Sequence, residues 1–153
     1  ALRDRWVEKF AEHGIEADRL ILKASADAAK SHLALVGEAD IALDPFPFNG
    51  ATTTYESLIM GVPVITLRGK HFVDRVAGSI LTHCGHSELV AETSEDYVTL
   101  ARELAGDPVR LSDLRRSLRE EFFSSTLSDG VSYTLSVEEG FRDMWRKWCE
   151  KTA

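Results

Sequence analysis

Three consecutive threonines, Thr52–Thr54, follow a turn that contains Asn49 and Gly50. The spacing predicts a helix over Thr52–Met60, so the threonines stand in its first turn, where backbone N–H groups have no partner within the helix. Hydroxyls beside those amides, together with the positive end of the helix dipole, favour an anion by about 0.3–1 kcal/mol. Gly50 lets a bound group approach the backbone closely. The pattern predicts a phosphate-binding turn that needs no lysine.

Glu56 follows the threonines at a helical spacing that suits the binding of a sugar next to a phosphate. Helical geometry places Glu56 on the same face as Thr52 and Thr53, one turn into the helix. A carboxylate there suits the two hydroxyls of a ribose, and a phosphate site beside a ribose site describes a nucleotide. A plainer interpretation stays open, because threonine runs commonly cap helices and the helix dipole alone favours an early glutamate.

Two further polar residues have alternative interpretations. Asp44 follows a predicted strand and is either catalytic or the cap of the next turn. His32 stands alone near a helix end, where a histidine is more often a surface or packed residue than a ligand.

Short apolar runs alternate with amphipathic segments through most of the chain. All-apolar strands between helices predict a parallel α/β sheet covered by helices on both sides. Ligands of such sheets bind beyond the carboxyl ends of the strands, which selects the loops Lys23–Ala26, Asp44–Ala51 and Arg68–His71. The predicted strands are Leu20–Leu22, Ile41–Leu43, Val64–Leu67 and Leu89–Ala91. The other predicted helices start at Leu2, Ala26, Arg75, Pro108 and Ser132, and one more follows a cap at either Thr93 or Ser94.

Composition narrows the classes of partner. The 153 residues carry 18 basic and 25 acidic side chains, a net charge of −7 that disfavours nucleic acid and anionic membranes. Apolar stretches are far shorter than the about 20 residues that span a bilayer, so we expect no membrane partner. The two cysteines lack the spacing of a metal or redox motif. We therefore expect a cytoplasmic protein without a metal or cofactor.

The segment from Asp40 to Leu67 closely resembles the carboxyl-terminal catalytic lobe of the O-linked GlcNAc transferases and SPINDLY-type proteins, glycosyltransferase family 41. Counterparts in the same order occur at 75–81, 88–91, 96–98 and 141–149. The resemblance implies a GT-B fold of two Rossmann-like lobes, in which residues 1–153 are a single nucleotide-sugar-binding lobe and 131–150 its C-terminal helix. It also implies a fragment of a longer chain that lacks the first strand of that lobe.

The resemblance assigns roles to the residues named above. Thr52 and Thr53 would hold the diphosphate, Glu56 the ribose, and His32 would pack near the base. The same pocket would be lined by Asn49, Gly50 and Thr54. The family needs no metal, and its candidate catalytic residues lie outside this chain.

The chain differs from the animal GlcNAc transferases at two positions that affect which donor nucleotide it would bind. The animal GlcNAc transferases have a histidine where this chain has Ala51, and a base-contacting lysine where it has Ala29. UDP-GlcNAc is the expected donor, and a GDP sugar is the alternative, since SPINDLY-type fucosyltransferases also lack that histidine.

The resemblance also predicts what the parent protein does. It would transfer GlcNAc or a related sugar from the nucleotide to Ser or Thr of proteins, which bind through helical repeats outside this chain. The fragment alone would bind nucleotide weakly and catalyse nothing. Its Phe141, Trp145 and Trp148 share a helix face that we expect to pack back on the domain; the alternative is that part of this face is exposed without the other lobe and drives self-association. The alternative is a non-catalytic module for assembly or protein binding.

Overall fold

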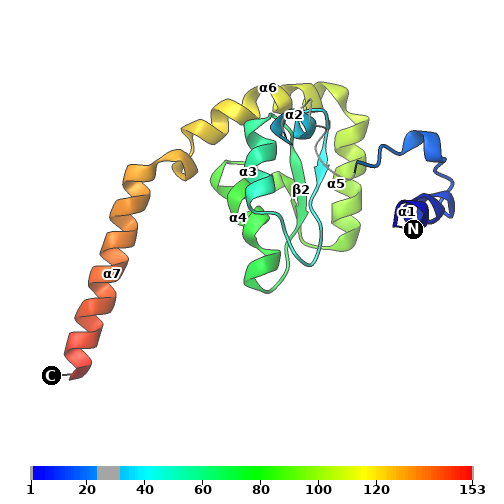
Figure 1. The fold of residues 1–153 in the computed structure, drawn as a ribbon. Coiled ribbons are helices and arrows are strands. Elements are labelled where there is room, and N and C mark those ends of the chain that lie inside the picture. Colours follow the sequence, from blue (N-terminus) through cyan, green and yellow to red (C-terminus); the bar gives the residue numbers. More distant parts are fainter. Residues whose placement is uncertain (1, 24–31, 153) are drawn as a thin grey trace. The chain divides into compact units, whose positions relative to one another are not determined.

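The computed structural model describes residues 2–23 and 32–152, and the chain divides into two compact units, residues 1–32 and 33–153. The two units are described separately (Figure 1). The prediction of a single lobe across residues 1–153 stays a prediction. The expected helix from Ala26 lies mostly outside the described residues; its described part is α2, His32–Val36.

The first unit contains α1, Leu2–Ala11, and a 3-10 turn, η1, Ala17–Arg19. The helix predicted from Leu2 is confirmed, and Gly14 follows it with a φ of +74°. The predicted strand Leu20–Leu22 is wrong. Leu20 has extended backbone angles, but the segment pairs with no described strand, and Ile21 is 83% exposed. An apolar run becomes a strand only where a neighbour completes its hydrogen-bond ladder.

The second unit is built on a parallel sheet, as predicted. Among the described residues it has three strands in the order β1-β2-β3, which are Ala42–Leu43, Val64–Leu67 and Val90–Ala91. Ala42 pairs with Val64 on one side of β2, and Thr66 pairs with Val90 on the other. The β-branched run of β2 is buried through its first three residues, as expected for a central strand between two layers.

Helices cover both faces of this sheet. Figure 1 shows α3, Thr52–Ile59, and α4, Val76–His83, on one side of β2, and α5, Ser94–Gly106, on the other. The next helix, α6, Pro108–Ser124, packs against both α3 and α5. Three 3-10 turns connect these elements: η2 (Phe72–Asp74), η3 (Ser87–Leu89) and η4 (Thr126–Ser128). The core includes Leu58, Ile65, Leu81, Leu89, Leu104 and Leu118.

Local capping chemistry sets the helix boundaries. The Thr93 hydroxyl accepts a hydrogen bond from the Asp96 amide and begins α5, while Asp107 accepts from Arg110 and begins α6 with Pro108 in its first turn. At the C-terminal end of α3, the Arg119 guanidinium of α6 donates a hydrogen bond to the Ile59 carbonyl at 2.7 Å. This last contact ties α3, the helix that carries the threonines, to α6.

The last helix, α7, runs from Gly130 to Thr152, slightly beyond the predicted 131–150. Its residues from Gly130 to Lys151 are all exposed, so the predicted packing of Phe141, Trp145 and Trp148 back on the domain is wrong. The Trp145 and Trp148 rings instead stack on each other with centroids 5.1 Å apart. None of the described helices is long and apolar enough to cross a membrane.

Candidate functional site

Asp44 anchors the loop that leads into α3. It follows β1 and is only 5% exposed. Its Oδ1 accepts a hydrogen bond from the Gly50 amide at 2.7 Å, and its Oδ2 accepts one from the Thr66 hydroxyl of β2 at 2.6 Å. Both carboxylate oxygens are therefore used to hold the loop against the sheet. Of the two interpretations of Asp44, this geometry favours the cap of the turn.

The surroundings of Asp44 oppose its charge. Burial raises the pKa of Asp44 above its ordinary value of 3.8, although the hydrogen bonds from Thr66 and Gly50 offset part of the rise. Tyr97 of α5 donates its hydroxyl proton to the Asp44 backbone carbonyl at 2.9 Å. Burial and the nearby Asp44 charge both raise the pKa of Tyr97, which keeps that donor protonated.

Two of the predicted pocket residues, Asn49 and Thr54, are buried. Thr54 is 2% exposed and donates its hydroxyl proton to the Gly50 carbonyl at 3.0 Å. Asn49 is 4% exposed, and its backbone amide donates to the Val73 carbonyl at 2.9 Å. Within the described chain the Asn49 Oδ1 has no hydrogen-bond partner. These two side chains shape the turn from the inside.

Gly50 lies where no side chain fits. A Cβ there would collide with the Thr53 hydroxyl and come within 3.2 Å of the Asp44 Oδ1. The backbone can therefore pass between the start of α3 and Asp44 only because residue 50 is a glycine. The Gly50 carbonyl accepts a hydrogen bond from the Thr54 hydroxyl, and the Gly50 amide donates one to the Asp44 carboxylate.

The remaining predicted residues of α3 are accessible. Thr52 and Thr53 are exposed, and Glu56 is half-buried one turn further along the same face. Ala51 is the N-cap and contributes no side-chain hydrogen bond. The described residues provide no acceptor for the Thr52 and Thr53 amides. The first turn of α3 thus presents two hydroxyls and two amides at the carboxyl end of β1.

His32 is the first residue of α2 and is exposed. It is the last residue of the first unit, whereas the α3 residues belong to the second. Ala29 lies outside the described residues.

The third predicted ligand loop, Arg68–His71, lines a cavity of about 480 Å³ beyond β2 and β3. Phe46 and Pro47, which belong to the same loop as Asn49, line it too. Residues 2–23 and 32–152 contain no group of three or more histidine, cysteine and acidic side chains placed to hold a metal ion.

Two positioning residues, Thr66 and Tyr97, were not predicted. Both act on Asp44, one on its carboxylate and one on its carbonyl. A signal for Thr66 existed, because a hydroxyl in the middle of an otherwise apolar buried strand needs a partner. The sequence offered no comparable signal for Tyr97, which lies 53 residues from Asp44.

The chain is similar to known proteins over most of its length. The family model described as glycosyl transferase family 41 matches residues 3–137. A barley protein (Hordeum vulgare) described as "Probable UDP-N-acetylglucosamine--peptide N-acetylglucosaminyltransferase SPINDLY" is 39% identical over 150 residues, 98% of this chain and 16% of its own length. A UDP-N-acetylglucosamine--peptide N-acetylglucosaminyltransferase of Caenorhabditis elegans is 33% identical over 90% of this chain and 12% of its own length.

A solved structure supports the same relationship. An O-GlcNAc transferase of Thermobaculum terrenum, a K341M mutant, superposes with a TM-score of 0.87 and 36% sequence identity over 99% of this chain and 29% of its own. The chain spans about a sixth of the length of the curated plant relative that it matches. The match of the family model over most of the chain and the likeness to these relatives show that the chain belongs to glycosyltransferase family 41.

Proposed function

We propose that this chain is the donor-binding lobe, Rossmann-like and part of a GT-B fold, of a protein O-glycosyltransferase. The whole protein would transfer GlcNAc or a related sugar from a nucleotide diphosphate to Ser or Thr hydroxyls. The observation that carries the proposal is the first turn of α3, where exposed Thr52 and Thr53 stand beside amides for which the described residues provide no acceptor. Such a turn suits a pyrophosphate.

The chemistry follows from where charge develops. When the bond between sugar and diphosphate breaks, negative charge grows on the leaving phosphate oxygens. Donors fixed in advance stabilise that charge without having to reorganise. The Thr52 and Thr53 hydroxyls and amides are such donors, because Asp44 and Thr54 hold the preceding loop in place. The base that accepts the acceptor hydroxyl proton would come from another part of the protein.

Glu56 and His32 complete the proposed nucleotide site. Glu56 would accept hydrogen bonds from the ribose hydroxyls, and His32 would pack near the base. Asn49, Gly50 and Thr54 shape the pocket, two of them from buried positions. The names of the relatives support UDP-GlcNAc as the donor. A GDP sugar stays the alternative donor, because Ala51 stands where the animal GlcNAc transferases have a histidine.

The proposal is tested by measuring UDP and GDP affinity calorimetrically in the full-length protein that carries this chain, before and after Glu56→Ala. Loss of a hydrogen bond to a charged group costs about 1.5–3 kcal/mol, so affinity should fall about ten- to a hundred-fold. Glu103→Ala removes an exposed carboxylate of α5 and serves as the matched control, with no expected change.

The comparison of UDP with GDP identifies the base that the site prefers. An unchanged affinity in Glu56→Ala would contradict the ribose role. If neither nucleotide nor its sugar bound at millimolar concentration, the donor-lobe proposal would fail, and the non-catalytic assembly module would be the better interpretation.

A further inference from the structure

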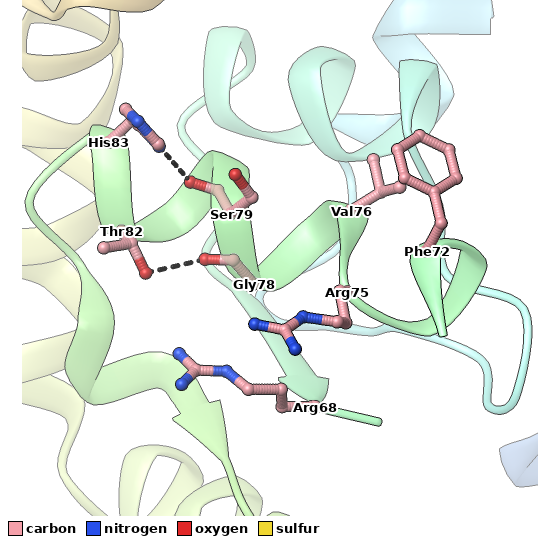
Figure 2. Close-up of a pocket in the computed structure, with 8 residues that line it drawn as sticks. All are labelled: Arg68, Phe72, Arg75, Val76, Gly78, Ser79, Thr82 and His83. Atoms are coloured by element: carbon pink, nitrogen blue, oxygen red, sulfur yellow. Dashed lines mark hydrogen bonds between the residues drawn. The ribbon is translucent and has the colours of Figure 1, made fainter. Parts of the chain in front are cut away.

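A second cavity, of about 410 Å³, lies between the end of β2 and the side of α4. Its lining includes Arg68, Arg75, Ser79 and Thr82, none of which belongs to the proposed nucleotide site. Figure 2 shows the Arg68 and Arg75 guanidinium groups pointing into the same space beside Gly78. Two cations from different elements therefore face one small cavity.

The charges in this cavity are only partly balanced. Arg68 forms an ion pair with Glu92 at 3.0 Å. Arg75 is exposed, and among the described residues it has no carboxylate partner. Like charges side by side raise the energy of the empty site and favour an anion between them. This is a local excess of positive charge on a chain whose net charge is −7.

The local packing leaves room for the arginines. A Cβ at Gly78 would press on the Val90 Cγ1 at 3.3 Å and would lie in ordinary contact, at 3.9 Å, with the Arg68 Nε, so the Arg68 side chain lies directly against α4. The Thr82 hydroxyl donates its proton to the Gly78 carbonyl at 2.7 Å, so that proton is already used within α4. The two arginines thus supply the positive charge, and Gly78, Ser79 and Thr82 of α4 line one wall of the cavity with small side chains.

We propose that this cavity binds the phosphate group of a small phosphomonoester, at a site separate from the first turn of α3. A phosphomonoester carries a charge of about −1.5 to −2 at neutral pH, which matches two guanidinium groups better than a single carboxylate does. Guanidinium groups also bind phosphate oxygens in a bidentate geometry. The volume lies within the range of about 300–1,000 Å³ that is typical of small-molecule sites.

The test uses the 153-residue chain, inorganic phosphate as the probe, and acetate as the carboxylate arm, followed by amide chemical shifts in NMR. Phosphate should shift the amides of Ser79 and Thr82 and saturate at lower concentration than acetate. Arg75→Gln, which removes an exposed side chain without a carboxylate partner, should weaken phosphate binding about ten-fold or more. Arg102→Gln, at an exposed arginine of α5, is the control and should leave binding unchanged.

A second variant protects the test against a folding defect. Ser79→Glu places a carboxylate at an exposed helical position on the cavity wall and should abolish phosphate binding while circular dichroism stays unchanged. Shifts confined to the Thr53 amide would assign phosphate to the nucleotide site and overturn the proposal. Equal weakening by Arg102→Gln, or equal affinity for acetate, would also overturn it.

Discussion

The carboxylate of Asp44 and the hydroxyl of Thr66 meet at 2.6 Å inside the protein, although the residues are 22 positions apart in the chain. This contact ties the end of β1 to β2, and the second oxygen of the same carboxylate holds the Gly50 amide. The turn that presents Thr52 and Thr53 therefore depends on one buried acid. Its protonation state should influence both stability and the shape of the turn.

Asp44→Asn should reveal this dependence through pH. Because burial raises the pKa of Asp44 in the folded state, its contribution to stability is fully present below pH 3.8 and is lost as pH rises through the folded-state pKa. Asparagine can accept from Gly50 and donate to the Thr66 oxygen without titrating. The free energy of unfolding of the wild type, measured with urea, should therefore decline relative to Asp44→Asn between pH 3 and pH 7.

Asp18→Asn, which removes an exposed carboxylate of η1, provides the control for general charge effects. A wild-type minus Asp44→Asn difference that stays flat with pH, or that grows as pH rises, would contradict the prediction.

Local chemistry explains the parts of the fold that were predictable. The β-branched run Val64–Leu67 is a strand with the predicted bounds, and Thr93 and Asp107 begin helices because their side chains bond to nearby amides. Leu20–Leu22 was wrongly predicted to be a strand, because an apolar run does not show whether a neighbouring strand is present to pair with it. A ladder needs two strands, and only tertiary structure supplies the second.

The candidate site was predictable in its position but not in its internal contacts. Thr54 was expected to line the pocket with the other threonines, yet it is buried with Ser57 and Leu58. Helical periodicity could have shown this, since positions 54, 57 and 58 share one face with a leucine. The bond from Tyr97 to Asp44 depends on how α5 packs on the sheet, which no local pattern encodes.

Gly50→Ala should destabilise the protein and weaken nucleotide binding. The added Cβ would collide with the Thr53 hydroxyl and press on Asp44, and such overpacking costs about 1–3 kcal/mol. Gly140→Ala is the matched control, because a Cβ there meets nothing within 4 Å and the position lies inside the exposed helix α7. That change should stabilise α7 by about 0.5–1 kcal/mol.

Thermal unfolding followed by circular dichroism, together with UDP titration of each variant, measures these effects. Equal stability of Gly50→Ala and wild type would show that Thr53 moves aside at no cost.

His86→Ala should lower the free energy of unfolding by about 1.5–3 kcal/mol, because hydrogen bonds to charged groups are lost. The His86 ring is buried and joins two carboxylates, with Nδ1 at 3.0 Å from Glu88 and Nε2 at 2.7 Å from Glu121 of α6. Glu121→Gln keeps an acceptor, and its side chain is partly solvated, so it should cost less.

Urea unfolding at neutral pH compares the two variants, with His13→Ala as a control at an exposed histidine. If Glu121→Gln proved as damaging as His86→Ala, the bond to Glu121 alone would account for the stabilisation, and the contact with Glu88 would contribute nothing.

Acidification should loosen the start of α7 before the sheet unfolds. Asp129 accepts a hydrogen bond from the Ser132 amide at 3.0 Å and another from the Ser132 hydroxyl, and these bonds lower the pKa of Asp129 below its ordinary value of 3.8. Its stabilising effect is therefore present above pH 3.8 and is lost as pH falls through the lowered folded-state pKa. Amide hydrogen exchange between Val131 and Ser136 should accelerate over that acidic range, after correction for the intrinsic rate.

Asp129→Asn retains an oxygen that caps the helix but does not titrate, so the same amides should show no acid-dependent loss of protection. Equal acid sensitivity in wild type and Asp129→Asn would mean that another group controls the start of α7.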